Sequence, residues 1–219
     1  MKKRVAHLTF CGVYCILALI GLLADFGAFS GSFSTRPFVF YTSLSNMLCS
    51  AFMVFSLIRN LRRGEIEVCP LVKFVFVVMI LLTAIVFNLF LNSYSSIIAY
   101  FAAYKNALYH LILPVMFFLD WIIFYKKGTL KLRDPLLALI IPLVYVIYII
   151  LRACVVRFGR LTVSVLYPYF FLNVDRLGWH GVVLWIGILL IMLLLLGYGL
   201  YGIDRGLSSK RKSAGTSIR

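Results

Sequence analysis

The sequence predicts an all-α polytopic membrane protein, with six transmembrane helices in one bundle. Of its 219 residues, 63% are hydrophobic and 13% are charged, and the mean hydropathy is +1.02. Soluble domains carry about 25% charged and about 45–50% apolar residues, so this chain lacks the polar surface that a soluble globule needs. A helical span takes about 20 apolar residues. The length therefore accommodates about six spans and leaves no room for a separate soluble domain.

Six apolar segments are long enough to be spans, and three of them begin at a proline, which suits the first turn of a helix. The predicted spans are 5–28, 37–58, 70–91, 104–125, 135–151 and 178–201. They give a transmembrane domain over residues 1–203. Residues 204–219 are short and basic and are expected to form a disordered cytoplasmic tail.

The net charge of +15 comes from 22 basic and 7 acidic residues, and the basic residues gather at the ends of the spans. One side of the predicted membrane holds Lys2, Lys3, Arg4, Arg59, Arg62, Arg63, Lys73, Lys126, Lys127, Lys131, Arg133, Arg205, Lys210, Arg211, Lys212 and Arg219. The other side holds Arg36, Lys105, Arg152, Arg157, Arg160 and Arg176. The positive-inside rule places the richer side, with both termini, in the cytoplasm. This pattern indicates topology in a cell membrane, and we expect no nucleic-acid partner.

Cysteine and histidine spacing gives no metal motif, and neither a G-x-S-x-G elbow nor a Walker loop is present. We therefore expect no cofactor and no metal. The cysteines are interpreted as small apolar residues in or near helices; they are Cys11, Cys15, Cys49, Cys69 and Cys154.

Polar side chains inside spans are costly, so their positions are informative. Those in the predicted outer half are Asp25, Thr42, Ser45, Asn46, Asn88, Asn106 and His110. At 1.5 Å per residue, Thr42 and His110 lie about 8 Å and about 9 Å below the outer boundary of their spans. We therefore predict one polar layer, in which the two side chains approach within hydrogen-bond reach or within one water.

Pro114 lacks the N–H that would bond the carbonyl of His110, four residues earlier. The helix is expected to kink there and to free a carbonyl beside the imidazole, which protein or a cavity must satisfy. The other histidines, His7 and His180, lie near span ends and are expected to be interfacial. Asp120 is expected to be an inner-end anchor or an ion-pair partner.

A histidine beside a hydroxyl can act as a general base and make the hydroxyl a nucleophile. The polar layer is thus compatible with ester hydrolysis through an acyl-enzyme that water releases. Asn46, Asn88 or Ser45 would donate to the oxyanion, and Asp25 would orient the imidazole. The alternative reading is structural, since hydroxyls in membrane helices usually hydrogen-bond to a helix backbone.

The longest predicted outer loop, 152–177, contains an aromatic run, Tyr167-Pro168-Tyr169-Phe170-Phe171-Leu172. The run is too short to span a membrane and fits an interfacial or re-entrant segment. It is interpreted either as a plain aromatic anchor or as a lid over a cavity that opens outward.

Three segments resemble motifs of known families. They are Tyr41-Thr42-Ser43-Leu44-Ser45-Asn46, Tyr109-His110-Leu111-Ile112-Leu113-Pro114 with Leu119-Asp120-Trp121, and Tyr167-Pro168-Tyr169-Phe170 through Asp175-Arg176-Leu177-Gly178. With these motifs the chain resembles, over most of its length, a family of bacterial six-span membrane proteins without assigned activity. The first two segments resemble, more distantly, the androgen-induced-protein family of intramembrane threonine hydrolases, which act on fatty acid esters of hydroxy fatty acids. That resemblance implies Thr42 as nucleophile and His110 as base.

The sequence therefore predicts a candidate Thr/His hydrolase of lipophilic, fatty acyl esters, whose partners are membrane lipids and the ester substrate. The main alternative is a non-enzymatic binder or transporter of a small lipophilic molecule that uses the same polar layer. A structural membrane subunit is the third possibility. A transporter would favour inverted repeats, and no clear repeat is present.

Both termini are predicted to be cytoplasmic because of the asymmetry in basic residues. A reporter that is active only outside the cytoplasm should be silent when it is fused to the C-terminus. A reporter that is active only inside should give full signal. The opposite pair of signals would overturn the predicted orientation.

Overall fold

The computed structural model describes the backbone of residues 1–216 and the side chains of residues 1–209. Within that range the chain is helical and contains no strand, and six helices are long and apolar enough to cross a membrane. These are Lys2–Asp25, Tyr41–Arg63, Pro70–Leu91, Tyr104–Phe124, Asp134–Phe158 and Val174–Ser209. The predicted fold class, a multi-pass all-α membrane protein, is confirmed.

Several of the six spans are built from shorter elements. The α-helices are α1 (Lys2–Asp25), α2 (Tyr41–Arg63), α3 (Pro70–Val86), α4 (Ile97–Ala102), α5 (Tyr104–Ala107), α6 (Leu113–Phe124), α7 (Asp134–Leu137), α8 (Ile140–Phe158) and α9 (Val174–Thr216). Short 3-10 helices cover Arg36–Phe38 and Phe170–Leu172, and π-helical turns cover Phe87–Leu91 and Leu108–Ile112.

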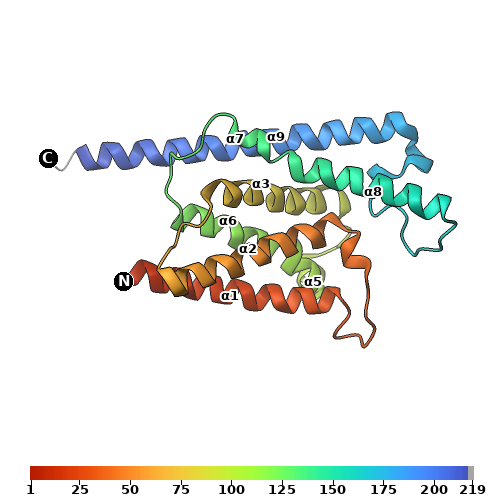
Figure 1. Cartoon of the computed structure of the whole chain (residues 1–219), viewed down its shortest axis with the longest axis horizontal. Helices are drawn as coiled ribbons and strands as arrows, with labels where there is room; N and C mark the ends of the chain where they lie inside the picture. The colour runs from red at the N-terminus through yellow and green to blue at the C-terminus, as the bar shows by residue number, and fades with distance from the viewer. Residues whose placement is uncertain (217–219) are drawn as a thin grey trace.

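The long helices run side by side, and both chain termini lie at the same end of the bundle (Figure 1). We call this end the terminal end and the opposite one the distal end. Helices α1, α2, α3 and α6 pack against one another around one buried core. Helix α9 packs on α3, and a second core at the distal end joins α8, α9 and the Phe170–Leu172 turn.

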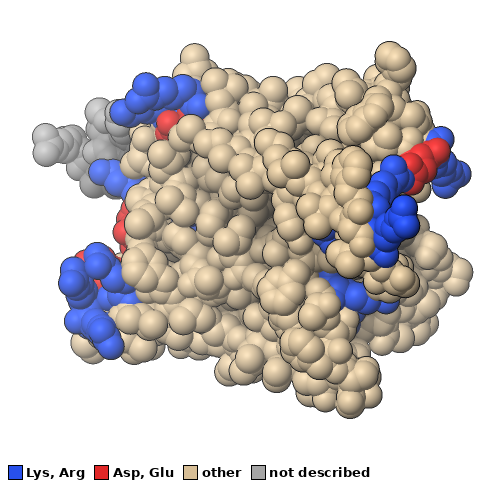
Figure 2. Space-filling view, turned by 45° about the vertical axis from the view of Figure 1, so that its right-hand side comes forward, with Lys and Arg blue, Asp and Glu red and all other residues tan. Residues whose placement is uncertain are grey.

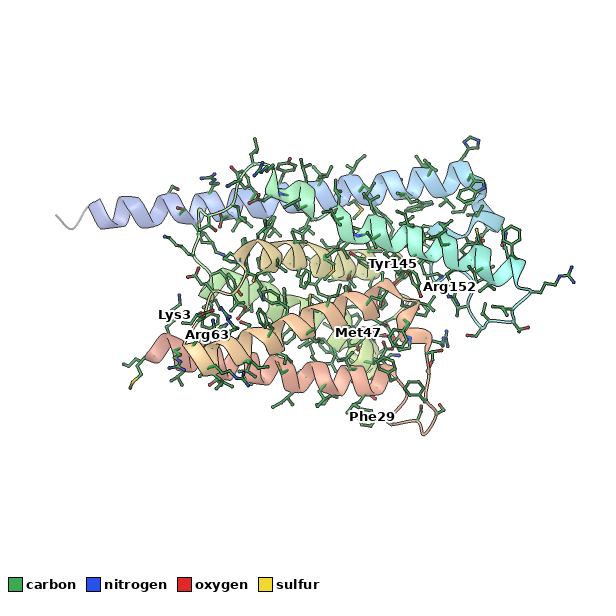
Figure 3. All side chains as sticks on the ribbon, viewed as in Figure 1. Lys3, Phe29, Met47, Arg63, Tyr145 and Arg152 are labelled. Atoms are coloured by element: carbon green, nitrogen blue, oxygen red, sulfur yellow. The ribbon has the colours of Figure 1, made fainter. Side chains whose placement is uncertain are left out.

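Basic residues gather at the two ends of the molecule and leave a surface without charged residues between them (Figure 2). Lys3 and Arg63 lie at the terminal end, and Phe29 lies in the loop at the distal end (Figure 3). This distribution agrees with charges that flank membrane spans.

The start of α2 differs from the prediction. Pro37 lies in the 3-10 turn Arg36–Phe38, Phe40 is extended, and α2 begins only at Tyr41. The proline therefore lies in a separate short turn and not at the start of the span. As a result, Thr42 lies in the first turn of α2, at the distal end, one residue after the start of the span and not five.

The basic tail also differs from the prediction. We expected 204–219 to be disordered, but residues 204–209 are helical and continue α9, which has a kink at Gly178 (φ 64°, ψ 172°). Asp204 is buried and its Oδ2 accepts hydrogen bonds from the backbone N–H groups of Gly128 and Leu130, at 2.9 and 3.4 Å. These bonds tie the helix to the loop before α7. Residues 217–219 lie outside the described part of the chain.

Candidate functional site

A layer of polar contacts joins α1, α2 and α5 near the distal end. One carboxylate oxygen of Asp25 accepts from Ser43 Oγ at 2.5 Å, and the other pairs with Lys105 Nζ at 3.1 Å. Asp25 is thus engaged with two helices other than its own. The prediction that Asp25 orients His110 finds no such contact among the described residues.

Two polar residues of α2 link it to the neighbouring helices. Asn46 Nδ2 donates to the carbonyls of Thr42 and Tyr109, at 2.9 and 3.3 Å. Ser45 Oγ donates to the Thr42 carbonyl at 3.0 Å and lies 3.1 Å from Thr83 Oγ1 on α3. The polar face predicted for this span therefore does face the bundle.

His110 lies in the π-helical turn Leu108–Ile112, just before Pro114, and its side chain is buried. Its carbonyl accepts a hydrogen bond from Asn88 Nδ2 at 3.2 Å. Pro114 was expected to free this carbonyl, and the Asn88 amide of the π-helical turn Phe87–Leu91 satisfies it, as predicted. Isolated π-helical turns in α-helices are frequent at functional sites.

The His110 ring stacks on Phe87, with centroids 3.5 Å apart and planes 4° from parallel. Its Nδ1 is buried, and no hydrogen-bond partner for it exists among the described residues. A buried polar atom without a partner is costly. The imidazole therefore has a free position for a proton donor or acceptor.

Thr42 has a different partner from the predicted one. Both its Oγ1 and its backbone N–H lie within reach of the Tyr169 hydroxyl, at 3.4 and 3.3 Å. Within the described part of the chain no hydrogen bond joins Thr42 to His110. The reason is the helix register: Asn46 is the α2 residue that meets the turn containing His110, and Thr42 lies one turn, about 6 Å, nearer the distal end.

A cavity of about 70 Å³ lies between the start of α2 and helices α3, α8 and α9. We call it the Thr42 pocket. Its lining is almost wholly apolar and includes Phe87, while its residues with a polar side-chain group are Tyr41, Thr42, Thr83, Tyr145 and Tyr169. The Tyr145 hydroxyl is already engaged, because it donates to the Val39 carbonyl at 2.9 Å. His110 is not part of the lining. Phe87 therefore contacts both the pocket and the His110 ring.

The aromatic run folds over this pocket. Tyr169 and Phe171 stack with centroids 5.0 Å apart, and Phe170 packs edge-on against Trp185 of α9 at 5.2 Å. Burial raises the pKa of Tyr169, so its hydroxyl keeps its proton at neutral pH and can donate to Thr42 Oγ1. This placement agrees with the lid interpretation of the run.

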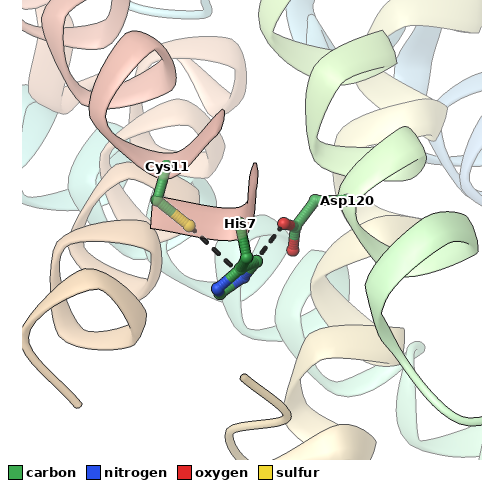
Figure 4. Close-up of side chains that lie close together, drawn as sticks. All are labelled: His7, Cys11 and Asp120. Carbon is green, nitrogen blue, oxygen red and sulfur yellow. Dashed lines mark hydrogen bonds and ion pairs between the residues drawn. The ribbon is translucent and has the colours of Figure 1, made fainter. Parts of the chain in front are cut away.

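A second polar cluster lies near the terminal end, and its side chains are fully buried. Lys73 Nζ of α3 lies 2.9 Å from Asp120 Oδ2 of α6, and His7 Nε2 of α1 lies 3.3 Å from Asp120 Oδ1. The Lys73 ammonium also sits 3.2 Å from the centroid of the Phe117 ring. We call His7, Asn60, Lys73 and Asp120 the buried ion cluster. Figure 4 shows His7 and Asp120 beside Cys11.

The donors and acceptors around His7 can be assigned from its hydrogen bonds. Arg4 Nε donates to Asn60 Oδ1 at 3.2 Å, which turns the Asn60 amide nitrogen toward His7 Nδ1 at 2.7 Å. Nδ1 must accept this bond, so the His7 proton resides on Nε2, which faces Asp120. His7 is therefore a neutral donor, and its Nε2 hydrogen-bonds with Cys11 Sγ at 3.4 Å while it lies 3.3 Å from Asp120 Oδ1. Lys73 supplies the charge that balances the carboxylate.

His7, Cys11 and Asp120 also have the spacing of a metal site, because their ligand atoms lie within 4.8 Å of one another. As arranged, they do not suit a cation. The Lys73 ammonium already neutralises the carboxylate, and a metal on His7 Nε2 would displace the proton that the Asn60 amide places there. The geometry is that of an ion pair.

The buried ion cluster bears on three residues of the sequence analysis. His7 was predicted to be interfacial and is fully buried, and Lys73, which was counted on the cytoplasmic side, is fully buried too. The prediction of Asp120 as an ion-pair partner is confirmed, and His180 is exposed. His7, Lys73 and Asp120 lie a few residues from the inner ends of three predicted spans, but the sequence does not show which faces of those helices meet.

Comparisons with known proteins give no match to a family model, a curated protein or a solved structure. The resemblances described above therefore rest on the quoted motifs. What they imply for Thr42 and His110 stays a prediction.

The buried ion cluster makes a prediction for stability. Lys73→Met should lower the free energy of unfolding by about 3–5 kcal/mol, because it leaves the buried Asp120 carboxylate without its counter-ion. Adding Asp120→Asn should restore most of that loss, since the neutral amide removes the unpaired buried charge. Thermal unfolding in detergent measures both effects.

The matched control is Arg59→Gln, which breaks the partly exposed Arg59–Glu65 pair. Its cost should be within about 1 kcal/mol. Equal losses for Lys73→Met with and without Asp120→Asn would contradict the role assigned to the charge pair.

Proposed function

We propose that this membrane protein binds a small lipophilic molecule in the Thr42 pocket. The observation that carries the proposal is Tyr41, which lines this apolar cavity and whose hydroxyl is buried without a hydrogen-bond partner among the described residues. Ligand sites typically combine an apolar lining with a few placed polar groups. A ligand oxygen that accepts from Tyr41 would relieve the cost of the unpaired donor.

The size and lining of the pocket narrow the class of ligand. About 70 Å³ is room for part of a molecule and not for a whole lipid. The hydroxyls of Tyr41 and Tyr169 can donate, and the remaining surface is almost all hydrocarbon. These features favour an apolar chain that carries a carbonyl or ester oxygen and enters from the bilayer.

Filling the pocket should weaken binding. Val146→Phe on α8 places a larger ring in the lining and should weaken binding of a fluorescent long-chain ester about tenfold or more, a loss of about 1.4 kcal/mol. Val144→Phe is the matched control, because Val144 lies on the same helix and is 59% exposed. Binding is measured with the protein in lipid nanodiscs. Equal affinities for the two folded variants would contradict the proposal.

Ester hydrolysis is the second candidate, and the unpartnered Nδ1 of His110 favours it. In the proposed reaction the Thr42 hydroxyl attacks the ester carbonyl, and the imidazole takes its proton. The alcohol leaves with that proton, and water then releases the acid from the acyl-threonine. Catalytic hydrogen bonds are often long before substrate binds. The present Thr42–Tyr169 contact would place a donor beside the oxyanion.

Phe87 is central to this second candidate, because it lines the pocket and stacks on His110. Hydrolysis requires that the imidazole reach the pocket. A change in the Phe87 side chain on substrate binding would open that route. Simple binding requires no such change.

Hydrolysis predicts that Thr42→Ala and His110→Ala each lower the turnover of a p-nitrophenyl long-chain ester by about 100-fold or more, because neither partner works alone. The double variant should be no slower than either single one. Stability should hardly change, since membrane side-chain hydrogen bonds average about 0.6 kcal/mol.

Thr83→Ala is the control for this test, as it removes another hydroxyl from the same pocket. Its turnover should stay near that of the natural protein. Turnover that is absent throughout, or that falls equally in all three single variants, would reject hydrolysis and leave the binding proposal in place.

A further inference from the structure

A second pocket lies at the distal end, and its polar groups are arginines and hydroxyls. It has a volume of about 260 Å³ and lies between the Arg36–Phe38 turn, α8 and the loop that follows α8. Arg36 and Arg152 line it together with three hydroxyl residues, Thr35, Thr162 and Ser164. No carboxylate takes part in the lining. We call it the arginine pocket; Arg152 is labelled in Figure 3.

The two arginines lack acidic partners within the described residues. The acidic residues of the distal end are Asp25 and Asp175, and both are engaged, with Lys105 and Arg157 respectively. Arg152 donates to the carbonyl of Leu166 at 3.0 Å, and Arg36 lies 6.0 Å from the centroid of the Phe40 ring. Most of the guanidinium N–H donors in the pocket are therefore free to bind an anion.

We propose that the arginine pocket binds a phosphate group. Two guanidiniums offer planar sets of donors that match phosphate oxygens bidentately, and three hydroxyls can bond any remaining oxygen. A carboxylate, with two oxygens, would leave much of this donor set unused. A phosphate, with more oxygens and more charge, would engage both sides of the pocket.

The position of the pocket allows two sources for this phosphate. The pocket lies where α8 approaches its distal end, which is the level at which lipid headgroups flank a spanning helix. Its lining also contains Val39 and Phe40, which could contact the glycerol part of a phospholipid. Free inorganic phosphate would use the same donors, and separate arms of one experiment distinguish the two.

The variants for this test are Arg36→Gln, Arg152→Gln and Arg152→Lys, with Arg176→Gln as the control. Arg176 is an exposed arginine of the same end that lies outside the pocket. Arg36→Gln is the decisive variant, because the Arg36 side chain makes no hydrogen bond within the described structure and its loss should leave the fold intact. Arg152→Gln also loses the hydrogen bond to the Leu166 carbonyl, and Arg152→Lys keeps the positive charge but loses the paired N–H donors of the guanidinium group.

In the first arm, the purified protein in neutral detergent is titrated with inorganic phosphate by calorimetry. In the second, native mass spectrometry compares retention of phosphatidic acid with that of a diacylglycerol of the same chains. In whichever arm shows binding, Arg36→Gln should lower the affinity by about tenfold or more, the loss expected for hydrogen bonds to a charged group. Arg176→Gln should leave the affinity unchanged, and Arg152→Lys should give an affinity between these two.

Binding in the first arm identifies free phosphate, and selective retention of phosphatidic acid alone identifies a lipid headgroup; either result supports the site. No binding in either arm, or equal losses in Arg36→Gln and Arg176→Gln, would overturn it. Ester binding by the Thr42 pocket is measured separately through Val146, which lies outside the arginine pocket. Failure of one proposal is thus distinguishable from failure of the other.

Discussion

The ion pair between Lys73 and Asp120 is the constraint on which the arrangement of the bundle depends. Both charges lie in an apolar interior, where an unpaired ion is strongly destabilising. Their pairing fixes which faces of α3 and α6 meet. His7 adds α1 to the same carboxylate, and Asn60 adds α2 through His7. One group of side chains thereby fixes the orientation of four helices about their own axes.

The distal end is held differently. Its contacts are mostly bonds from neutral hydroxyls and amides to backbone carbonyls, as for Ser45, Asn46 and Asn88. Such bonds are individually weak in membranes, and the helices there include two π-helical turns. The Tyr41 hydroxyl and His110 Nδ1 lie without partners at this end, and other unpartnered groups, such as Ser56 Oγ and Asp204 Oδ1, lie toward the terminal end. The two ends therefore differ in what joins their helices, a buried charge pair at the terminal end and mainly neutral hydrogen bonds around the Thr42 pocket.

The sequence predicts the spans well because hydrophobic length is a local property of the chain. It also predicts that the His110 carbonyl needs a partner other than the usual helical N–H, because Pro114, one turn later, has no N–H. The start of α2 is missed, because Pro37 begins a 3-10 turn as readily as a helix. The buried ion cluster is missed for another reason: its residues come from four helices. Only the packing of those helices decides whether a charge near a span end meets water or a partner.

The two functional proposals for the distal end differ in one physical requirement. Binding needs only the pocket, its hydroxyls and access from the bilayer. Hydrolysis needs in addition that the His110 imidazole reach the Thr42 hydroxyl, and the register of α2 against the π-helical turn now places Thr42 one turn too far. Phe87 contacts the pocket on one side and the imidazole on the other. Its side chain is therefore the part of the structure through which a bound ester would have to act to convert a binding site into a catalytic one.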